Sequence, residues 1–389
     1  MISKEAGLIQ SSVLSDRLGS IDALRGFVMI LMLVDHMRET FYLHAQVSDP
    51  VNVFTTSPEL FYTRLTSAIC APVFIWLTGL SAWLYSQKHS KTETSKFLLT
   101  RGIFLVFLEL TLIVFLWAGK YPPDMFFLQV IWCIGLCMIV LAGLIFLPPP
   151  ALLLLAVGIV AGHNLLSGLR VEEGSSFYVL WAVLYQREVL EVGSLVFRTS
   201  YPVLPWVGVI ALGYTAGPWF SKGFPSVQRQ RKLTTYGVVG LFLFFIVRYL
   251  NFYGDSPWIT GEEITTTLMS FLSLTKYPSS FLFNLSMISL GLLLLVLFEK
   301  FQDRKVSQVM SDFGAAPMFF YAFHLAVLKI IYTIAYSIYG PSDGVYLSFP
   351  SVGYIWLASA ILITALYAPT RWFAQYKQAN KHVEWLRYF

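Results

Sequence analysis

The feature that most constrains this chain is a series of ten apolar segments, each about as long as a helix that crosses a lipid bilayer. Such a helix needs roughly 20 mostly apolar residues. The segments lie at about 21–37, 67–86, 97–117, 126–147, 151–168, 202–220, 233–252, 280–298, 314–338 and 352–372. Only 13% of the residues are charged, whereas soluble proteins carry about 25%. We therefore expect one all-α integral membrane domain, residues 1–389, built as a bundle of about ten transmembrane helices.

The segment 175–200 fits this scheme least well. Its apolar residues are interrupted by Arg187, Glu188 and Glu191. An amphipathic stretch of this kind is expected to lie on the membrane surface rather than to cross the bilayer. The residues 148–150, 201–202 and 277–278 contain prolines that separate or begin the neighbouring segments, as expected of chain punctuation.

Lysine and arginine accumulate in alternate connecting segments, and this pattern predicts the orientation of the helices. They are concentrated in residues 1–17, 88–101, 222–232, 300–305 and 371–387, and are sparser in the intervening loops. Cytoplasmic loops retain an excess of these residues. Both termini are therefore expected to face the cytoplasm. We recognise no cleavable signal peptide, so the first apolar segment is expected to target the chain to the membrane.

The first segment is unusual because it carries several charges. The stretch "SIDALRGFVMILMLVDHMRE", residues 20–39, contains Arg25 well inside the apolar run and Asp35 near its end. A charge at the centre of a spanning helix costs at least about 2.5–3.5 kcal/mol unless it is paired or faces a wet cavity. Asp22, one turn before Arg25, offers a structural ion pair as one explanation. A functional site is the other.

Two further cations lie inside later segments. Arg248 and Lys329 are expected to form structural pairs or to extend their charged ends toward the membrane surface. Glu109, within the segment 97–117, is an available partner for one of them.

The histidines are the residues best suited to move protons near neutral pH. His36 follows Asp35 at the end of the first segment, His44 lies beyond it, and His324 lies near the middle of the segment 314–338. A neighbouring carboxylate can orient a histidine ring and raise its basicity, so Asp35 and His36 are candidates for a catalytic pair at the outer ends of the helices. A single membrane histidine such as His324 can instead be a hydrogen-bonded packing residue.

Other chemical signatures are missing from the sequence. Gly-rich phosphate loops, the HExxH zinc motif and GxSxG with its triad do not occur. Cys70, Cys133 and Cys137 all lie in apolar segments, where an unpaired cysteine behaves as a small hydrophobic residue. We expect no disulfide, no metal site and no nucleic-acid partner. The arrangement suits a transporter or an enzyme that uses an anionic cytoplasmic donor.

Five motifs in register resemble a known family. They are "RLGSIDALRGFVMILMLVDHMRE", "CAPVFIWLTGLSAWLY", "YPVLPWVGVIALGYTAGPWF", "LTKYPSSFLFNLSMISLG" and "FGAAPMFFYAFHLAVLK". Together they resemble the transmembrane acyltransferases related to heparan-alpha-glucosaminide N-acetyltransferase, in particular a bacterial branch. The resemblance extends from about Arg17 to the C-terminal "WLRYF".

The resemblance implies a multi-pass membrane enzyme, located in a bacterial inner membrane. Such an enzyme takes an acyl group, typically acetyl, from cytoplasmic acyl-CoA and delivers it to a sugar amine or hydroxyl on the far side. It implies acetyl-CoA, a glycan acceptor and the lipid bilayer as partners, and it leaves open whether the chain forms a homodimer. The alternative is a proton-coupled transporter of a sugar or an anionic solute. Transporters often contain inverted repeats, and we find no matching halves.

The resemblance also suggests which histidine is the base. In the wider superfamily an arginine in the first helix is followed eleven residues later by a histidine, and here Arg25 is followed by His36 at that spacing. The lysosomal branch has an asparagine at the place of His36 and its catalytic histidine further on. His44 is the nearest match to that second position, although the spacing is shorter by three residues. We rank His36 above His44.

The remaining roles follow from the chemistry that the resemblance implies. His36 would be the base, and Asp35 would orient it or stabilise its protonated form. Arg25 lies along the expected path of the donor, and two other cations are candidates for its phosphates, Lys96 and Arg101. Lys276, Tyr277 and His324 are candidates for the acceptor side. Whether the acceptor attacks the thioester directly or a histidine is acylated first stays open.

Overall fold

The computed structural model describes the backbone of residues 2–380, 382–383 and 386, and the side chains of this set from residue 19 onward. The side chains of Lys4, Arg17, Lys381 and Arg387, which contribute to the charge pattern above, lie outside the described residues. The elements are α1 (Ile2–Phe41), α2 (Pro58–Thr66), α3 (Cys70–Ser86), α4 (Lys91–Leu108), η1 (Glu109–Ile113), α5 (Val114–Ala118), β1 (Phe126–Phe127), α6 (Val130–Leu144), α7 (Pro149–Gly162), η2 (His163–Leu166), α8 (Tyr178–Leu184), β2 (Val189–Val192), β3 (Leu195–Arg198), α9 (Leu204–Thr215), η3 (Gly217–Phe220), α10 (Ser226–Leu250), α11 (Ile264–Leu272), α12 (Phe281–Lys300), α13 (Lys305–Gly314), α14 (Pro317–Tyr339) and α15 (Val352–Ala379).

Seven helical stretches of the described chain are long and apolar enough to cross a membrane. They are Pro58–Ser86, Lys91–Ala118, Pro149–Leu166, Ser226–Leu250, Phe281–Lys300, Pro317–Tyr339 and Val352–Ala379. The other three predicted segments, 21–37, 126–147 and 202–220, coincide with α1, α6 and α9, of which α6 and α9 have only 15 and 12 residues. The prediction of an all-α membrane protein is confirmed, while the count of ten spans and the orientation of the termini stay predictions.

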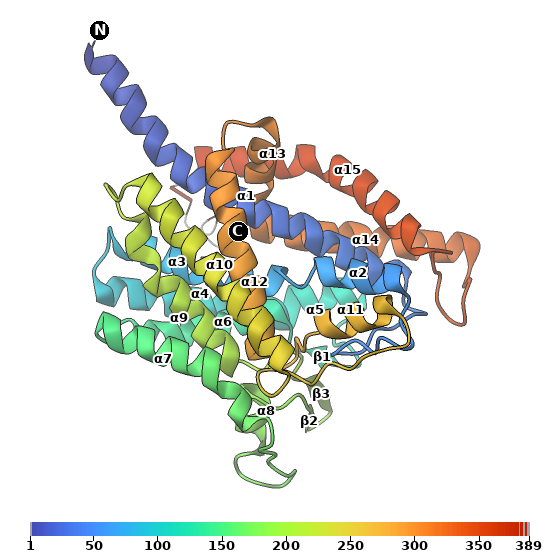
Figure 1. Cartoon of the computed structure of the whole chain (residues 1–389). Coiled ribbons are helices and arrows are strands. Elements are labelled where there is room, and N and C mark those ends of the chain that lie inside the picture. Colours follow the sequence, from blue (N-terminus) through green and yellow to red (C-terminus); the bar gives the residue numbers. More distant parts are fainter. Residues whose placement is uncertain (1, 381, 384–385, 387–389) are drawn as a thin grey trace.

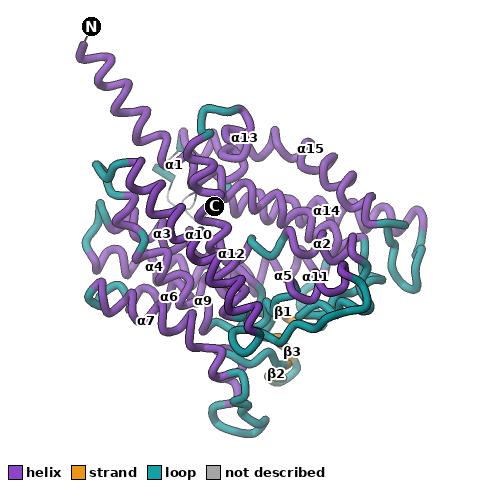
Figure 2. Tube along the Cα trace, in the orientation of Figure 1, coloured by secondary structure: helices purple, strands orange, loops and turns teal. Residues whose placement is uncertain are grey.

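The segment 175–200 contains a short helix and a β-hairpin. After α8, β2 pairs antiparallel with β3 around Gly193, whose positive φ of 62° suits a tight turn. β3 also pairs in parallel with β1, so that Phe197 lies opposite Phe126. The small sheet lies at one end of the bundle, among the loops (Figure 2). The predicted helix 126–147 therefore begins later, at Val130, because its first residues belong to the sheet.

The charged helix α1 lies in the middle of the bundle. It packs against α3, α12, α13, α14 and α15, and Figure 1 shows its N-terminal part projecting beyond the other helices. Gly26 and Gly314 allow the backbones of α1 and α13 to touch. A Cβ atom at Gly26 would lie 1.8 Å from the carbonyl oxygen of Met310. This packing holds the charges of α1 inside the protein rather than in lipid.

A second close backbone contact joins α3 and α9, and it gives a prediction about stability. A Cβ atom at Gly79 would lie 1.9 Å from the carbonyl oxygen of Ile210, and one at Gly213 would lie 1.9 Å from that of Trp76. Gly79→Ala is expected to destabilise the protein by about 1–3 kcal/mol or more, because overpacking forces the helices apart. The melting temperature of the detergent-solubilised protein should fall. Gly143→Ala in α6 is the control, since no atom lies within 4 Å of its Cβ position; equal melting temperatures for the two variants would contradict the close packing.

Candidate active site

A cavity of about 1110 Å³ follows α1 through the helical bundle. One end, the Arg25 end, is lined by Arg25, Tyr85, Arg101 and Lys377. The other end, the Lys276 end, is lined by Asp49, Arg64, Arg198 and Lys276. Arg25 and His36 both line the cavity, and eleven helical residues separate them by about 16 Å. One continuous cavity thus connects cationic groups far apart along the bundle.

His36 and His324 form a hydrogen-bonded pair between α1 and α14. Nδ1 of His36 lies 2.7 Å from Nε2 of His324, and the two rings stack with their centroids 5.0 Å apart. His324 is fully buried, and its own Nδ1 lies 2.6 Å from the carbonyl oxygen of Phe320. A carbonyl oxygen only accepts hydrogen bonds, so Nδ1 of His324 carries a proton.

This assignment fixes the proton positions on the neutral pair. Nε2 of neutral His324 has no proton and accepts the hydrogen bond that Nδ1–H of His36 donates. The lone pair of neutral His36 is therefore on Nε2. Because His36 lines the cavity and His324 stands behind it, His36 is placed to take a proton from a bound molecule. His324, expected on the acceptor side, lies behind His36 and outside the described cavity lining.

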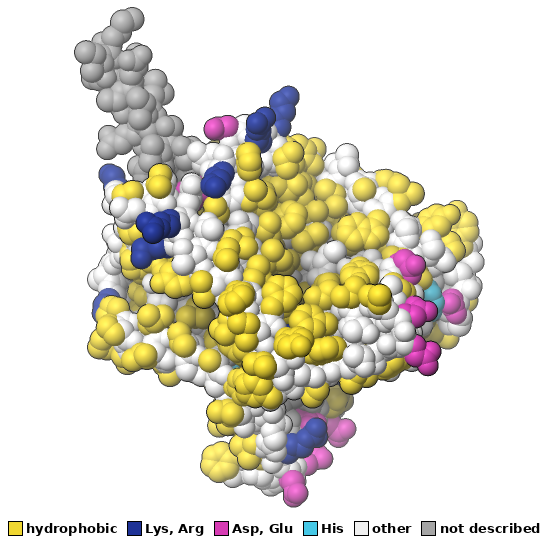
Figure 3. All heavy atoms as spheres, viewed as in Figure 1, with side chains coloured by type: hydrophobic (Ala, Val, Ile, Leu, Met, Phe, Trp, Pro, Cys, Tyr) yellow, Lys and Arg dark blue, Asp and Glu magenta, His cyan; other side chains and the backbone are white. Residues whose placement is uncertain are grey.

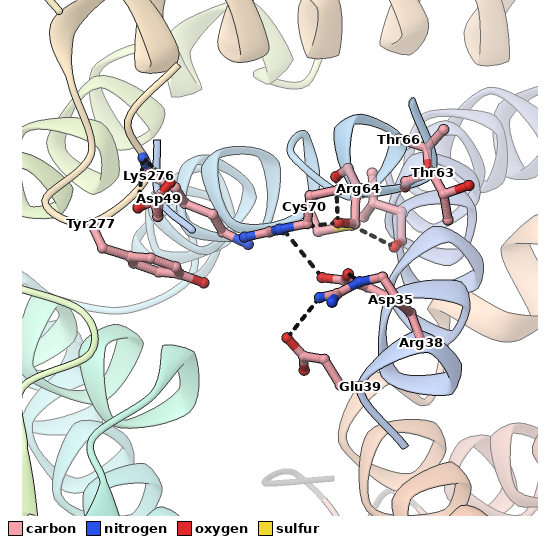
Figure 4. A network of polar contacts seen from close by, with 12 residues as sticks. Asp35, Arg38, Glu39, Asp49, Thr63, Arg64, Thr66, Cys70, Lys276 and Tyr277 are labelled. Atoms are coloured by element: carbon pink, nitrogen blue, oxygen red, sulfur yellow. Dashed lines mark hydrogen bonds and ion pairs between the residues drawn. The ribbon is translucent and has the colours of Figure 1, made fainter. Parts of the chain in front are cut away.

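Asp35 contacts two arginines rather than the His36 ring. Oδ1 of Asp35 accepts from Nε of Arg38 at 2.9 Å, and Oδ2 accepts from Nη1 of Arg64 at 3.3 Å. Arg38 also donates to Oε1 of Glu39 at 3.1 Å. Figure 4 shows this network beside Lys276 and Tyr277. The side chain that orients the His36 ring is thus His324, while Asp35 compensates two cations in a buried setting.

The Lys276 end combines cations with aromatic rings. The backbone N–H of Lys276 donates to both oxygens of Asp49, at 3.1 and 3.2 Å, and burial raises the pKa of the Asp49 carboxyl above its usual value. The Tyr277 hydroxyl donates to that of Tyr201 at 3.1 Å. The guanidinium of Arg187 lies over the Tyr277 ring, 5.1 Å from its centroid. Lys276 and Tyr277, both predicted site residues, therefore line the same end of the cavity.

At the Arg25 end, Arg25 is both paired and accessible to the cavity. Its Nη1 donates to Oδ1 of Asp22 at 2.6 Å and to the carbonyl oxygen of Gly314 at 3.2 Å. Its Nη2 donates to the Ser81 hydroxyl at 3.4 Å. The structural ion pair expected from the sequence is present, and it fixes the guanidinium at the cavity wall.

Of the two other cations predicted to bind the donor, only one lies at the cavity. Arg101 lines the cavity, whereas Lys96 is exposed and is not among the lining residues. Lys377 of α15 joins Arg101 there, which the sequence analysis did not anticipate. The sequence feature that could have pointed to Lys377 is its position in a cationic segment at the end of an apolar helix. Arg101 and Lys377 could hold an anionic group such as a phosphate.

His44 lies outside the cavity lining. Its Nε2 is 3.8 Å from Oδ2 of Asp343, and its ring lies beside that of Tyr42 with the centroids 4.3 Å apart. Of the two candidate bases, only His36 lines the cavity among the described residues.

The remaining intramembrane charges bind backbone carbonyls rather than one another. Arg248 donates to the carbonyl oxygens of Ser256, Ser270, Phe271 and Ser273. Lys329 donates to those of Trp117 and Ala118. Glu109, expected to pair with one of these cations, instead accepts from the backbone N–H of Trp132 at 3.2 Å. Arg248 and Lys329 therefore bind backbone carbonyls in place of the carboxylate partner expected from the sequence.

No group of three or more His, Cys, Asp or Glu residues in the described part of the chain could hold a metal ion.

Comparison with known proteins identifies the family. A search of curated proteins found no match to the chain. The model of the family described as "Heparan-alpha-glucosaminide N-acetyltransferase, catalytic" matches residues 17–253. This match covers more than half of the chain and includes Arg25, His36 and Arg101. The chain belongs to the heparan-alpha-glucosaminide N-acetyltransferase catalytic family, a family of membrane acetyltransferases.

Proposed function

We propose that this protein transfers an acyl group, most simply acetyl, from cytoplasmic acyl-CoA to an amino or hydroxyl group of a sugar on the other side of the membrane. One observation carries the proposal: a histidine with its Nε2 lone pair available lines a cavity that also reaches a cluster of cations about 16 Å away. CoA carries several phosphates and does not cross a bilayer freely. Its thin pantetheine arm can extend through a cavity of this length.

The donor would bind with its nucleotide at the Arg25 end. Arg101 and Lys377 would contact phosphates, and Arg25, already fixed by Asp22, would line the path of the pantetheine arm. Tyr85 and Phe97, whose rings stack with centroids 4.1 Å apart, line the same end and offer a flat apolar surface.

The acceptor would enter from the Lys276 end. Lys276 and Tyr277 line that end, together with Arg187 and Arg198 from the region of the hairpin. His36 would remove a proton from the attacking amine or hydroxyl, with His324 holding the ring in the required tautomer. Direct transfer to the acceptor needs only this base. Acylation of His36 itself is the alternative route.

This direction of transfer requires the predicted orientation. The Arg25 end would face the cytoplasm, together with both termini, in a bundle of ten spans in a bacterial inner membrane. On the face drawn in Figure 3, most Lys and Arg side chains lie toward the end from which α1 projects, and apolar side chains cover the middle. That distribution supports the cytoplasmic assignment of the α1 N-terminal end.

Two cations on α4 give a matched test of donor binding. Arg101→Gln is expected to weaken binding of acetyl-CoA roughly tenfold or more, because it removes a charged hydrogen bond to phosphate, worth about 1.5–3 kcal/mol. Lys96→Gln, on the same helix but outside the cavity, should change the affinity little. Isothermal titration of detergent-solubilised protein measures both. An equal loss in the two variants would place the nucleotide elsewhere on the surface.

A further inference from the structure

Two buried hydrogen-bond donors beside His36 make no hydrogen bond of good geometry within the protein, although their side chains are close enough to interact with each other. They are Nε1 of Trp117, in α5, and the hydroxyl of Tyr321, in α14. Both residues line the cavity, and Tyr321 is only 3% exposed. A buried donor without an acceptor is costly and rare in folded proteins. Two such donors on separate helices, both on residues that line one cavity, indicate that a bound group supplies the acceptor.

The rings that carry both donors lie next to His36, the candidate base. The Trp117 ring lies edge-on to the His36 ring, with centroids 5.0 Å apart and planes at 82°, and the Tyr321 ring lies at 5.8 Å and 69°. Tyr321 is one turn before His324, so α14 carries both the hydroxyl and the group that fixes the tautomer of His36. Lys329, on the same helix, donates to the carbonyl oxygen of Trp117 at 3.2 Å and joins the end of α5 to α14.

We infer that the Trp117 indole N–H and the Tyr321 hydroxyl bind the carbonyl oxygen of the acyl donor and stabilise the oxyanion that forms from it. This inference rests on the proposed function. The acceptor nitrogen or oxygen forms a bond to the acyl carbon, its proton moves to Nε2 of His36, and the carbonyl π electrons move to the oxygen. When the carbonyl re-forms, the carbon–sulfur bond breaks and the CoA thiolate leaves, taking the proton from His36. Hydrogen-bond donors directed at this oxygen stabilise its negative charge most strongly in a site that excludes water.

Glu109 also lines the cavity and has an unpartnered atom, but it is less suited to this role. Its Oε1 is buried without a partner, while its Oε2 accepts the Trp132 N–H. An ionised carboxylate only accepts hydrogen bonds and would repel an oxyanion, so Glu109 could act here only in its protonated form. The Trp117 indole and the Tyr321 hydroxyl, by contrast, donate hydrogen bonds in their ordinary neutral forms.

The inference is tested with Tyr321→Phe and Trp117→Phe, each of which removes one donor and keeps an aromatic ring. Each variant is expected to lower kcat for transfer from acetyl-CoA to glucosamine, used as a probe acceptor, by about 10²–10³-fold. The Kd of acetyl-CoA should change less than threefold. The controls are Tyr185→Phe and Trp206→Phe, buried rings outside the cavity lining; Trp206 also has an unpartnered indole nitrogen. Both controls should keep full activity.

A spectroscopic measurement separates donors from packing residues. Infrared difference spectra of acetyl-CoA labelled with ¹³C at the carbonyl should show a stretch at lower frequency when bound to the wild type than in water. This shift should shrink in each variant. If the wild type binds and transfers acetyl but the variants keep both kcat and the carbonyl frequency, the inference is wrong and the proposed function stands. If the wild type neither binds acetyl-CoA nor transfers acetyl, both fail.

Discussion

Replacing His36 by glutamine is expected to slow acyl transfer by about 10²–10⁴-fold, the usual contribution of a general base. Glutamine is similar in size, and its side-chain N–H can still donate to Nε2 of His324, so the pair should remain packed. What the variant loses is the lone pair that accepts the proton. The release of CoA thiol from acetyl-CoA, with glucosamine as acceptor, measures the rate. Binding of acetyl-CoA should be nearly unchanged.

His44→Gln is the matched comparison for this experiment. His44 lies outside the cavity lining, beside Asp343, and its replacement should leave the rate within about a factor of three, well below the loss expected of a base. A full rate in His36→Gln together with a large loss in His44→Gln would instead support the base position of the lysosomal branch.

Replacing Asp35 by asparagine is expected to destabilise the fold by about 3–5 kcal/mol, because it leaves buried cations without their carboxylate. Arg38 and Arg64 both donate to Asp35, at 2.9 and 3.3 Å. The midpoint of thermal unfolding in detergent should fall by several degrees. Asp124→Asn removes an exposed ion pair with Lys120 and should change the midpoint little.

The same variant distinguishes two roles for Asp35. If Asp35 mainly compensates the arginines, activity per folded molecule should fall far less than in His36→Gln. A protein that stays as stable as the wild type but loses activity to the same extent would show that Asp35 acts on the His36 ring, as the sequence alone suggests.

Local features of the sequence predicted the apolar helices and singled out several residues that line one cavity. Length and apolar content located the apolar helices, seven of which in the described chain are long enough to cross a bilayer. The cost of a charge in lipid singled out Arg25 and Asp35, and the structure places the helix that carries them at the centre of the bundle. His36, Arg101, Lys276 and Tyr277 all line one cavity.

Partners distant in the sequence could not be predicted in this way. His324 is 288 residues from His36, and no periodicity relates them. Adjacency suggested Asp35 as the partner of His36, but successive residues on a helix point in directions about 100° apart, and Asp35 meets Arg64 instead. The hairpin of β2 and β3 was missed because its strands have only four residues each, too few for a clear alternating pattern.

Transfer of an acetyl group across a sealed membrane can be measured with the purified protein in vesicles. Proteoliposomes would contain glucosamine in the lumen and receive acetyl-labelled acetyl-CoA only from outside, so that molecules with the Arg25 end outward are supplied with donor. Labelled N-acetylglucosamine is expected inside the vesicles for the wild type, and almost none for His36→Gln. Passage of unmodified glucosamine out of the vesicles without CoA release would indicate a transporter. Label confined to products outside the vesicles would show that the cavity does not carry the acyl group across the membrane.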